Sequence, residues 1–330
     1  MVRKGLTVLG RAVQLALVAG LLVWAWLAVV FHATGWLATS LGGAVLAMAA
    51  VAAFAAWQRR WGSLWAGFAI ILALGSVWWF AQAPRDDRNW AFDVRHGVTA
   101  RIDGSRVTLS NVRNFDWQTP ETAVESWEDR VVDIDTITSV DMFTSVWDSP
   151  LIAHTLVSFG FADGQQIVFS GEIRREQGET FSALGGFFKL YELVMIAADE
   201  RDIVYLRTDV RGEDVSLFPV TLSPEARRDL FLTFIDRANA LAQQPEWYHT
   251  VLANCTTVPF QLVKSIAPDL AFDWRVLASG HLPGYLHDLG VLRPDLPLDT
   301  VLARARLGKS GNMAAHGTAY SQMLRRRWAN

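Results

Sequence analysis

The chain has 330 residues, of which 51% are hydrophobic, and its 30 basic and 33 acidic residues give a net charge of −3. This balance lacks the basic surplus that binds nucleic acid through its phosphates, so we expect no nucleic-acid partner. A single cysteine excludes an intramolecular disulfide. The sequence has no internal repeat, glycine-rich phosphate loop or His-Glu-x-x-His pattern, and we expect no cofactor and no metal ion.

The first quarter of the chain contains three apolar segments, at residues 12–31, 36–57 and 61–82. Each is close to the roughly 20 residues that a helix needs to cross a bilayer. A cleaved signal peptide has a shorter apolar core with no further spans behind it, and a buried hairpin of a soluble protein rarely has apolar runs of this length. We therefore predict three transmembrane helices.

The charges beside these segments predict their orientation. No acidic residue precedes Arg85, and with three helices all the basic residues before it fall on one side: Arg3, Lys4, Arg11, Arg59 and Arg60. Because cytoplasmic flanks collect Lys and Arg, the chain after the third segment is expected on the opposite side of the membrane. We predict a membrane anchor at residues 1–84 and one domain at 85–330, whose net charge is −8 once the +5 of the anchor is removed.

This domain begins with a pattern typical of antiparallel sheet. One hairpin is predicted at residues 98–112, where Asp103-Gly104 separates two β-branched runs, and a second at 152–173. Further strands are predicted at 191–196, 203–207 and 215–221.

Helices are predicted after these strands. Ser223 and Pro224 are typical of a helix start, and apolar residues then recur at helical spacing as far as Leu241. A second helix is predicted directly after Cys255. Strands followed by helices indicate the α+β class.

Cys255 is the candidate nucleophile because it opens this second helix. The free N–H groups and the positive dipole end of a helix start favour a thiolate, and they can also donate to the oxyanion that forms when sulfur attacks a carbonyl. We expect its neighbours Asn254 and Thr256 to support that oxyanion. A lone cysteine is by default a small buried hydrophobic residue, so a catalytic assignment also requires a base.

The predicted base is His154, which lies within the first strand of the second hairpin. His249 is the alternative, but its nearness to Cys255 along the chain does not aim it at the thiol. If the hairpin turns at its glycine, Glu172 on the returning strand passes His154, where a carboxylate would orient the imidazole. Ser170 is the reserve for this third position, because the sequence does not fix the strand register.

Three other groups of residues, two charged and one aromatic, allow a structural or a functional interpretation. We interpret the charged residues from Arg174 to Arg207 as an ion-pair lattice and the arginines at 325–327 as a solvated tail, with a contact to anionic lipid as the alternative for the tail. A group of aromatic residues is interpreted either as core or as the wall of an acyl groove: Phe181, Phe187, Phe188 and Tyr191.

At these residues the sequence resembles the Lnb-type N-terminal periplasmic domain. The resemblance covers residues 111–266, and its most specific part is a histidine followed by Asn254-Cys255-Thr256-Thr257. The other runs that carry it are Asn111-Val112-Arg113-Asn114-Phe115, Ala153-His154-Thr155, Ser170-Gly171-Glu172-Ile173-Arg174-Arg175-Glu176, Tyr191-Glu192-Leu193 and Asp199-Glu200-Arg201-Asp202. The resemblance implies a permuted papain-like fold of the NlpC type, in which a strand histidine precedes a cysteine at a helix start.

The resemblance also implies an activity, the N-acylation of bacterial lipoproteins. An acyl chain would pass from a phospholipid, through a thioester on Cys255, to the amine of a lipoprotein's N-terminal cysteine. The expected partners are the phospholipid donor, the lipoprotein acceptor and the membrane. The expected location is the bacterial inner membrane, with the domain in the periplasm. Two other functions stay open: a papain-like peptidase or amidase of the cell wall, and a non-catalytic membrane-anchored binding module with a buried Cys255.

Overall fold

The computed structural model describes residues 2–310 and 318–328. The chain forms two compact units, Met1–Pro84 and Arg85–Asn330, which we call the membrane unit and the C-terminal unit. The membrane unit consists of α1 (Val2–His32), α2 (Gly35–Trp57) and α3 (Trp61–Ala81). Each of these helices is long and apolar enough to cross a membrane, as the sequence predicted.

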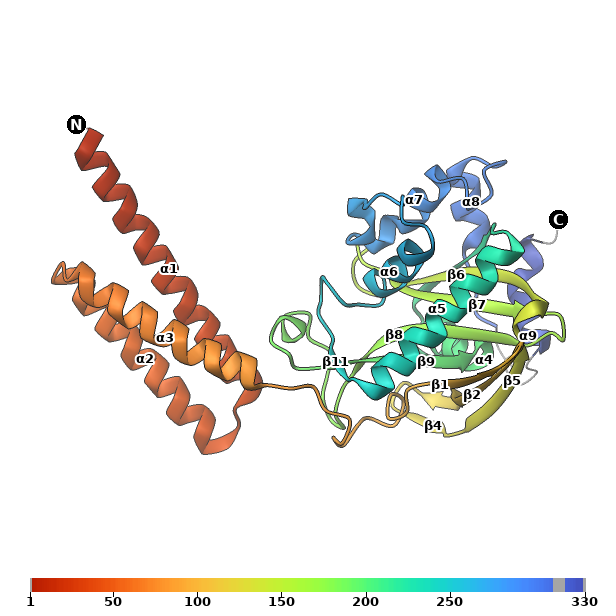
Figure 1. Ribbon diagram of the computed structural model, residues 1–330, viewed down its shortest axis with the longest axis horizontal. Coiled ribbons are helices and arrows are strands. Elements are labelled where there is room, and N and C mark those ends of the chain that lie inside the picture. The colour runs from red at the N-terminus through yellow and green to blue at the C-terminus, as the bar shows by residue number, and fades with distance from the viewer. Residues whose placement is uncertain (1, 311–317, 329–330) are drawn as a thin grey trace. The chain divides into compact units, whose positions relative to one another are not determined.

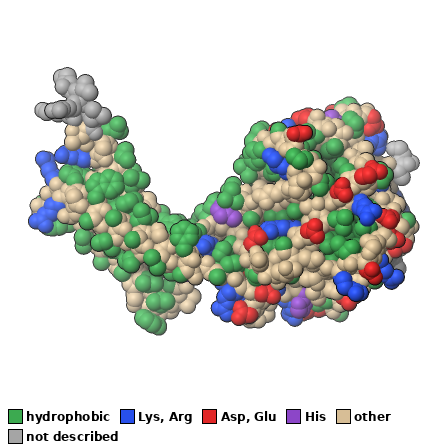
Figure 2. All heavy atoms as spheres, in the orientation of Figure 1, with side chains coloured by type: hydrophobic (Ala, Val, Ile, Leu, Met, Phe, Trp, Pro, Cys, Tyr) green, Lys and Arg blue, Asp and Glu red, His purple; other side chains and the backbone are tan. Residues whose placement is uncertain are grey.

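The surface of the membrane unit is apolar along the helices, and its described Arg side chains gather at one end (Figure 2). Gln14, the strongly polar residue of the first segment, is buried and donates from Nε2 to the carbonyl of Trp61 at 2.9 Å. This hydrogen bond satisfies a side chain that would otherwise be costly to place in lipid.

The C-terminal unit is built on a nine-stranded, mostly antiparallel sheet (Figure 1). Its strands follow the order β1-β2-β9-β8-β7-β6-β10, with β5 paired to β2 and β11 paired to β9. Only the β2–β9 pairing is parallel among the described strands. The bounds are β1 (Thr99–Asp103), β2 (Arg106–Arg113), β5 (Trp127–Asp133), β6 (Ile137–Val146), β7 (His154–Phe161), β8 (Gln166–Arg174), β9 (Glu192–Asp199), β10 (Asp214–Val220) and β11 (Glu246–Trp247). A separate small sheet contains β3 (Asp116–Thr119) and β4 (Thr122–Val124).

Helices pack against both faces of this sheet, and strand alternation decides which side chains each helix meets. On one face, α5 (Pro224–Gln243) and α6 (Thr257–Ile266) share a core with Phe159 and its neighbours. On the other face, α4 (Glu200–Tyr205) and α9 (Thr318–Arg325) share a second core with Leu156 and its neighbours. A third core joins β6 and β10 to α7 (Leu282–Asp288) and α8 (Leu298–Ala305).

Both predicted hairpins and the predicted helix after Ser223 are present. β1 and β2 turn between Asp103 and Arg106, where Gly104 has a φ of +61°, a conformation that glycine adopts without a steric penalty. The Ser223 hydroxyl accepts from the N–H of Ala226 at 3.2 Å and caps α5. The chain therefore has three N-terminal apolar helices followed by a mixed α and β domain.

The strand predicted at residues 203–207 is wrong, because this segment is helical. α4 continues into a π-helical turn at Leu206–Val210. The side chain of Asp199 accepts from the N–H of Arg201 and caps α4, and Ile203 is buried in the second core. Capping and burial against the sheet outweigh the β propensity of this β-branched stretch.

The solvated tail predicted at residues 325–327 is wrong for its first arginine. Arg325 donates to Asp141 Oδ2 at 2.6 Å and to Glu200 Oε1 at 2.6 Å, and both carboxylates are buried. Arg326 is exposed, as expected of a solvated residue. The end of the described chain therefore closes the second core instead of extending from it.

Candidate active site

Two neighbouring strands bring the polar residues of the site together. The backbones of β7 and β8 pair only between residues 157–160 and 166–169, and the site lies where this ladder opens. There His154 Nε2 lies 3.0 Å from Glu172 Oε1 and 2.8 Å from Ser170 Oγ. The Ser170 hydroxyl donates to the same carboxylate oxygen at 2.8 Å. The contact predicted between His154 and Glu172 is therefore present, and Ser170 joins it.

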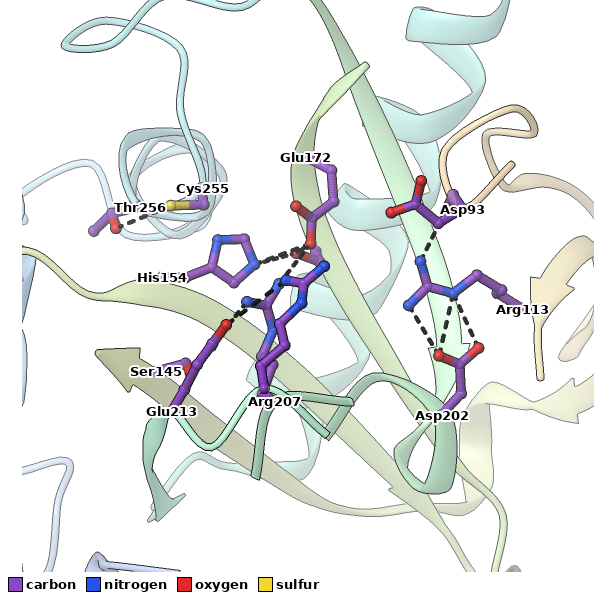
Figure 3. A network of polar contacts seen from close by, with 12 residues as sticks. Asp93, Arg113, Ser145, His154, Glu172, Asp202, Arg207, Glu213, Cys255 and Thr256 are labelled. Carbon is purple, nitrogen blue, oxygen red and sulfur yellow. Dashed lines mark hydrogen bonds and ion pairs between the residues drawn. The ribbon is translucent and has the colours of Figure 1, made fainter. Parts of the chain in front are cut away.

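Cys255 approaches the imidazole from the side opposite Glu172 (Figure 3). It is half-buried and lies two residues before the first residue of α6. Its sulfur faces the imidazole of His154, and the opposite charges of the two side chains stabilise each other. Because Glu172 and Ser170 occupy Nε2 of the ring, Nδ1 is the nitrogen left for the thiol.

Arg207, Glu213 and Ser145 extend this hydrogen-bond network from the carboxylate of Glu172. Arg207 donates from Nη2 to Glu172 Oε1 at 3.1 Å and from Nη1 to Glu213 Oε2 at 3.3 Å, and the Ser145 hydroxyl also donates to Glu213. Arg207 is buried, and its Nε has no partner among the described residues. It is carried by the π-helical turn after α4, a type of distortion that occurs often at functional sites.

The electrostatics of this cluster favour an imidazolium and a thiolate. Burial and the Arg207 charge oppose protonation of the ring, but the negative charges of Glu172 and Cys255 outweigh them and raise the pKa of His154 to about 9. Burial opposes ionisation of the thiol, yet the facing imidazolium lowers the pKa of Cys255. Burial likewise opposes ionisation of Glu172, but His154 and Arg207 hold its pKa well below the usual range.

The expected oxyanion site needs a correction. The backbone N–H groups of Thr256 and Thr257 both donate to Asn254 Oδ1 at 2.8 Å, so they are not free to hold an oxyanion. The Asn254 side chain holds the chain at the start of α6 instead, and its Nδ2 donates to the carbonyl of Thr250 at 2.7 Å. The backbone N–H of Cys255 has no hydrogen-bond partner in the described chain and is the donor left at this position.

The Thr256 side chain anchors the cysteine loop to the sheet. Its hydroxyl lies 3.0 Å from the Thr155 hydroxyl on β7 and 3.9 Å from Cys255 Sγ. The loop and the histidine strand therefore share a direct contact beside the sulfur.

The site opens into a cleft of about 670 Å³. Cys255, His154 and Glu172 line it together with four arginines and several aromatic side chains: Arg113, Arg175, Arg207, Arg211, Phe92, Trp147, Phe181 and Tyr248. One part of the cleft wall is charged and another is apolar. A substrate with both a polar and an apolar part therefore matches the lining.

Residues 123–280 match the family model of the Lnb N-terminal periplasmic domain. This segment is an Lnb N-terminal periplasmic domain. The match contains Cys255, His154 and Glu172. No curated protein and no solved structure matches the chain. With the three candidate spans before it, the Lnb domain indicates a membrane protein with a periplasmic domain.

The ring of His249, the alternative base, is hydrogen-bonded to the backbone of the residues that follow it. Its Nδ1 accepts from the backbone N–H groups of Val251 and Leu252 at 3.1 and 3.2 Å. Its ring packs edge to face on Phe187. These contacts hold the turn before Cys255, so His249 shapes the loop that carries the thiol.

The aromatic group considered for an acyl groove divides in two. Phe181 lines the cleft and is 50% exposed, and Phe187 is 40% exposed. Phe188 and Tyr191 are buried. The core interpretation therefore holds for the last two residues, and only Phe181 of the four contributes to the cleft.

Sequence reasoning missed three residues of the site. Arg207 was assigned to an ion-pair lattice, although it contacts Glu172. Tyr248 is buried beside Cys255 and lines the cleft, and its hydroxyl has no hydrogen-bond partner among the described residues. Burial and the negative charges of Cys255 and Glu172 raise the pKa of Tyr248, so the hydroxyl stays protonated and can donate. The position of this tyrosine, seven residues before the cysteine, was the one sequence feature that could have indicated its place in the site.

The third missed residue is Ser279, which holds the backbone before the histidine. Its hydroxyl accepts from the N–H of Ala153 at 2.8 Å and donates to the carbonyl of the same residue at 2.7 Å. Ser279 is buried and lies 126 positions along the chain from Ala153. No sequence pattern indicates a contact of this range.

Proposed function

We propose that this protein is a membrane-anchored cysteine acyltransferase that moves an acyl chain from a phospholipid, through a thioester on Cys255, to the N-terminal amine of a bacterial lipoprotein. The observation that carries the proposal is the line of Cys255, His154 and Glu172 opening into a cleft. This line supplies a nucleophile, a proton carrier and an orienting carboxylate. The succession of histidine and cysteine along the chain also supports a permuted papain-like fold of the NlpC type.

In the first half-reaction, the Cys255 thiolate attacks the carbonyl carbon of a phospholipid ester. The tetrahedral oxyanion accepts hydrogen bonds from the N–H of Cys255 and the hydroxyl of Tyr248. The carbon–oxygen bond to the glycerol then breaks, and His154 gives its proton to the departing oxygen. The products are a lysophospholipid, a thioester on Cys255 and a neutral imidazole.

In the second half-reaction, the lipoprotein amine attacks the thioester carbonyl. His154, now neutral, removes a proton from the attacking nitrogen, and the carbon–sulfur bond breaks. The products are the amide and the restored imidazolium–thiolate pair. Glu172 stays ionised throughout and stabilises the charged imidazole in both halves.

The membrane helices support this assignment because both proposed substrates are held in lipid. Attachment to the same membrane raises the local concentration of enzyme and substrate and replaces a three-dimensional search. The apolar part of the cleft, with Phe181 and Trp147, suits an acyl chain and would keep water from the thioester.

The proposal is tested by mass spectrometry of lipoprotein N-termini in a host depleted of its own N-acyltransferase. The intact protein is expected to restore the third acyl chain, and Cys255→Ala is expected to reduce this activity about 1,000-fold or more. Ser265→Ala, on the exposed side of α6, serves as the expression control and is expected to act like the intact protein. Equal restoration by Cys255→Ala would rule out the thioester mechanism.

One observation favours a second candidate function, a cell-wall peptidase or amidase. The charged part of the cleft, with Arg175 and Glu213 beside the apolar wall, also suits a polar peptide. The same residues would then transfer the acyl group to water. Release of peptide fragments from purified cell wall by the intact protein, without any restoration of lipoprotein acylation, would favour this function.

A further inference from the structure

Four arginines line the cleft beside Cys255, and they differ in how their charge is balanced. Arg113 donates to both oxygens of Asp202 and to the carbonyl of Asp93. Arg175 donates from Nη2 to both oxygens of Asp93, at 2.9 and 3.0 Å. These guanidinium groups have their acceptors within the protein.

Arg211 lacks such acceptors. Its one ionic contact in the described part of the chain is to Glu213 Oε1 at 3.7 Å, and no group there accepts a hydrogen bond from its guanidinium. The other oxygen of Glu213 is already shared by Arg207 and Ser145. Arg211 therefore keeps most of its donors unused.

The position of Arg211 makes these unused donors accessible to a ligand. Its side chain is 31% exposed and lines the same cleft as Cys255. It follows directly after the π-helical turn that carries Arg207, so its backbone is fixed by the turn that supports Glu172. No Arg211 nitrogen is among the buried atoms without a partner, so solvent reaches these donors and an anion can replace it there.

We propose that Arg211 is the binding residue for the phosphate group of the glycerophospholipid donor. A guanidinium matches a phosphate with two parallel hydrogen bonds, which an ammonium does not reproduce. In one lipid molecule the phosphate is joined to the reacting ester through the glycerol, so a donor with its ester at Cys255 carries its phosphate to another part of the same wall. This inference rests on the proposed function and names the part of the donor that the site reads.

The charge of the whole domain makes a specific contact necessary. Residues 85–330 have a net charge of −8, so their overall field does not attract an anionic headgroup. Two further carboxylates of the cleft lining, Glu121 and Glu179, add to this repulsion. A local cation whose one ionic contact in the described chain is the 3.7 Å contact to Glu213 is what allows a phosphate to bind there.

The test measures the acyl adduct on Cys255 by intact mass spectrometry of the full-length protein in nanodiscs. Two donors with the same acyl chains are compared, phosphatidylglycerol and a diacylglycerol that lacks the phosphate. Arg211→Gln is expected to raise the half-maximal concentration of phosphatidylglycerol about 10-fold and to leave the reaction with diacylglycerol unchanged. Arg211→Lys is expected to lie between the two proteins, because it keeps the charge but loses the paired hydrogen bonds.

The matched control is Arg237→Gln. Arg237 lies on α5 and pairs with Glu246 away from the cleft, so both donors are expected to react as with the intact protein. An equal loss with both donors in Arg211→Gln would assign Arg211 a structural role and overturn the inference, as would no loss with either donor. Inorganic phosphate that competes as well as the lipid headgroup would assign the site to the free ion instead.

The two proposals fail in different ways in this experiment. If the intact protein forms no adduct with either donor, the acyltransferase function is wrong and the phosphate site is overturned with it. If the adduct forms but does not depend on Arg211, only the phosphate site is wrong.

Discussion

Two clusters of buried charge lie along β7, one around Arg325 and the other around Arg207. Arg325 donates to Asp141 and Glu200, and the Ser158 hydroxyl on β7 donates to Glu200 at 2.7 Å. Helix α9 closes this cluster with the buried side chains of the second core. Both carboxylates of this cluster bind the one guanidinium of Arg325 inside the protein, so its contribution is to stability.

The cluster around Arg207 has similar residue types but is open. Glu172 and His154 connect this cluster to the cleft, and Arg207 Nε lacks a partner among the described residues. The imidazole of His154 also faces the thiol of Cys255. Buried ion pairs on one sheet therefore serve different purposes according to solvent access and the reactivity of the neighbouring group.

The largest effect on stability is expected at the closed cluster. Arg325→Ala leaves two buried carboxylates without a cation and should lower the free energy of unfolding by about 3–5 kcal/mol. Because protonation neutralises these carboxylates, the deficit should shrink as the pH falls from neutral towards 5. Chemical denaturation across this pH range measures both effects. Arg326→Ala, at the exposed neighbouring position, is the control, and an equal loss there would contradict the closed-cluster interpretation.

A large effect on rate without a loss of stability is expected at the open cluster. Tyr248→Phe removes a hydroxyl that has no partner in the described structure, so unfolding should be unchanged while adduct formation on Cys255 slows about 100-fold. Tyr285→Phe is the matched control and should affect stability instead of rate. The Tyr285 hydroxyl donates to the carbonyl of Ala271 at 2.6 Å and lies outside the cleft. Its removal should cost about 1 kcal/mol of stability and leave the rate unchanged. Similar rates for Tyr248→Phe and the intact protein would remove Tyr248 from the oxyanion site.

A smaller effect with a defined pH signature is expected for Glu172→Gln. The charge of Glu172 helps raise the pKa of His154 to about 9, and the proposed transfer needs a protonated ring to release the lysophospholipid. Activity of the intact protein should therefore fall as the pH rises through about 9.

The variant should lose about 10-fold in rate at neutral pH, and its alkaline limb should move to lower pH. Glu128→Gln, whose carboxylate pairs with Arg130 outside the cleft, should keep the original profile. An alkaline limb that stays in place in Glu172→Gln would show that Glu172 does not set the proton affinity of the ring.

Local chemistry explains what the sequence could predict. The Ser223 cap and the glycine turns act within a few residues of chain, so the helix and hairpins that they define are readable. The contact of His154 with Glu172 belongs to one hairpin, whose turn sets the register. Cys255 was identifiable because it is the only cysteine and precedes a helical pattern.

Long-range packing explains what the sequence could not predict. The segment at residues 203–207 is helical because the sheet buries its apolar side, although its residues favour strand. The helix-start amides were expected to be free, but a single side chain, that of Asn254, accepts from two of them. Arg207 and Tyr248 reach the site from other elements, and nothing in their local sequence indicates that approach.

The contact of Ser279 with Ala153 has a consequence for how the protein matures. Ser279 fastens both backbone groups of the residue before His154 from 126 positions further along the chain. During export Cys255 emerges before Ser279, so a chain that is still being translocated lacks this contact. We expect Cys255 and His154 to reach their final arrangement only after Ser279 has docked against Ala153, so an interrupted chain should lack the reactivity that we propose for the pair.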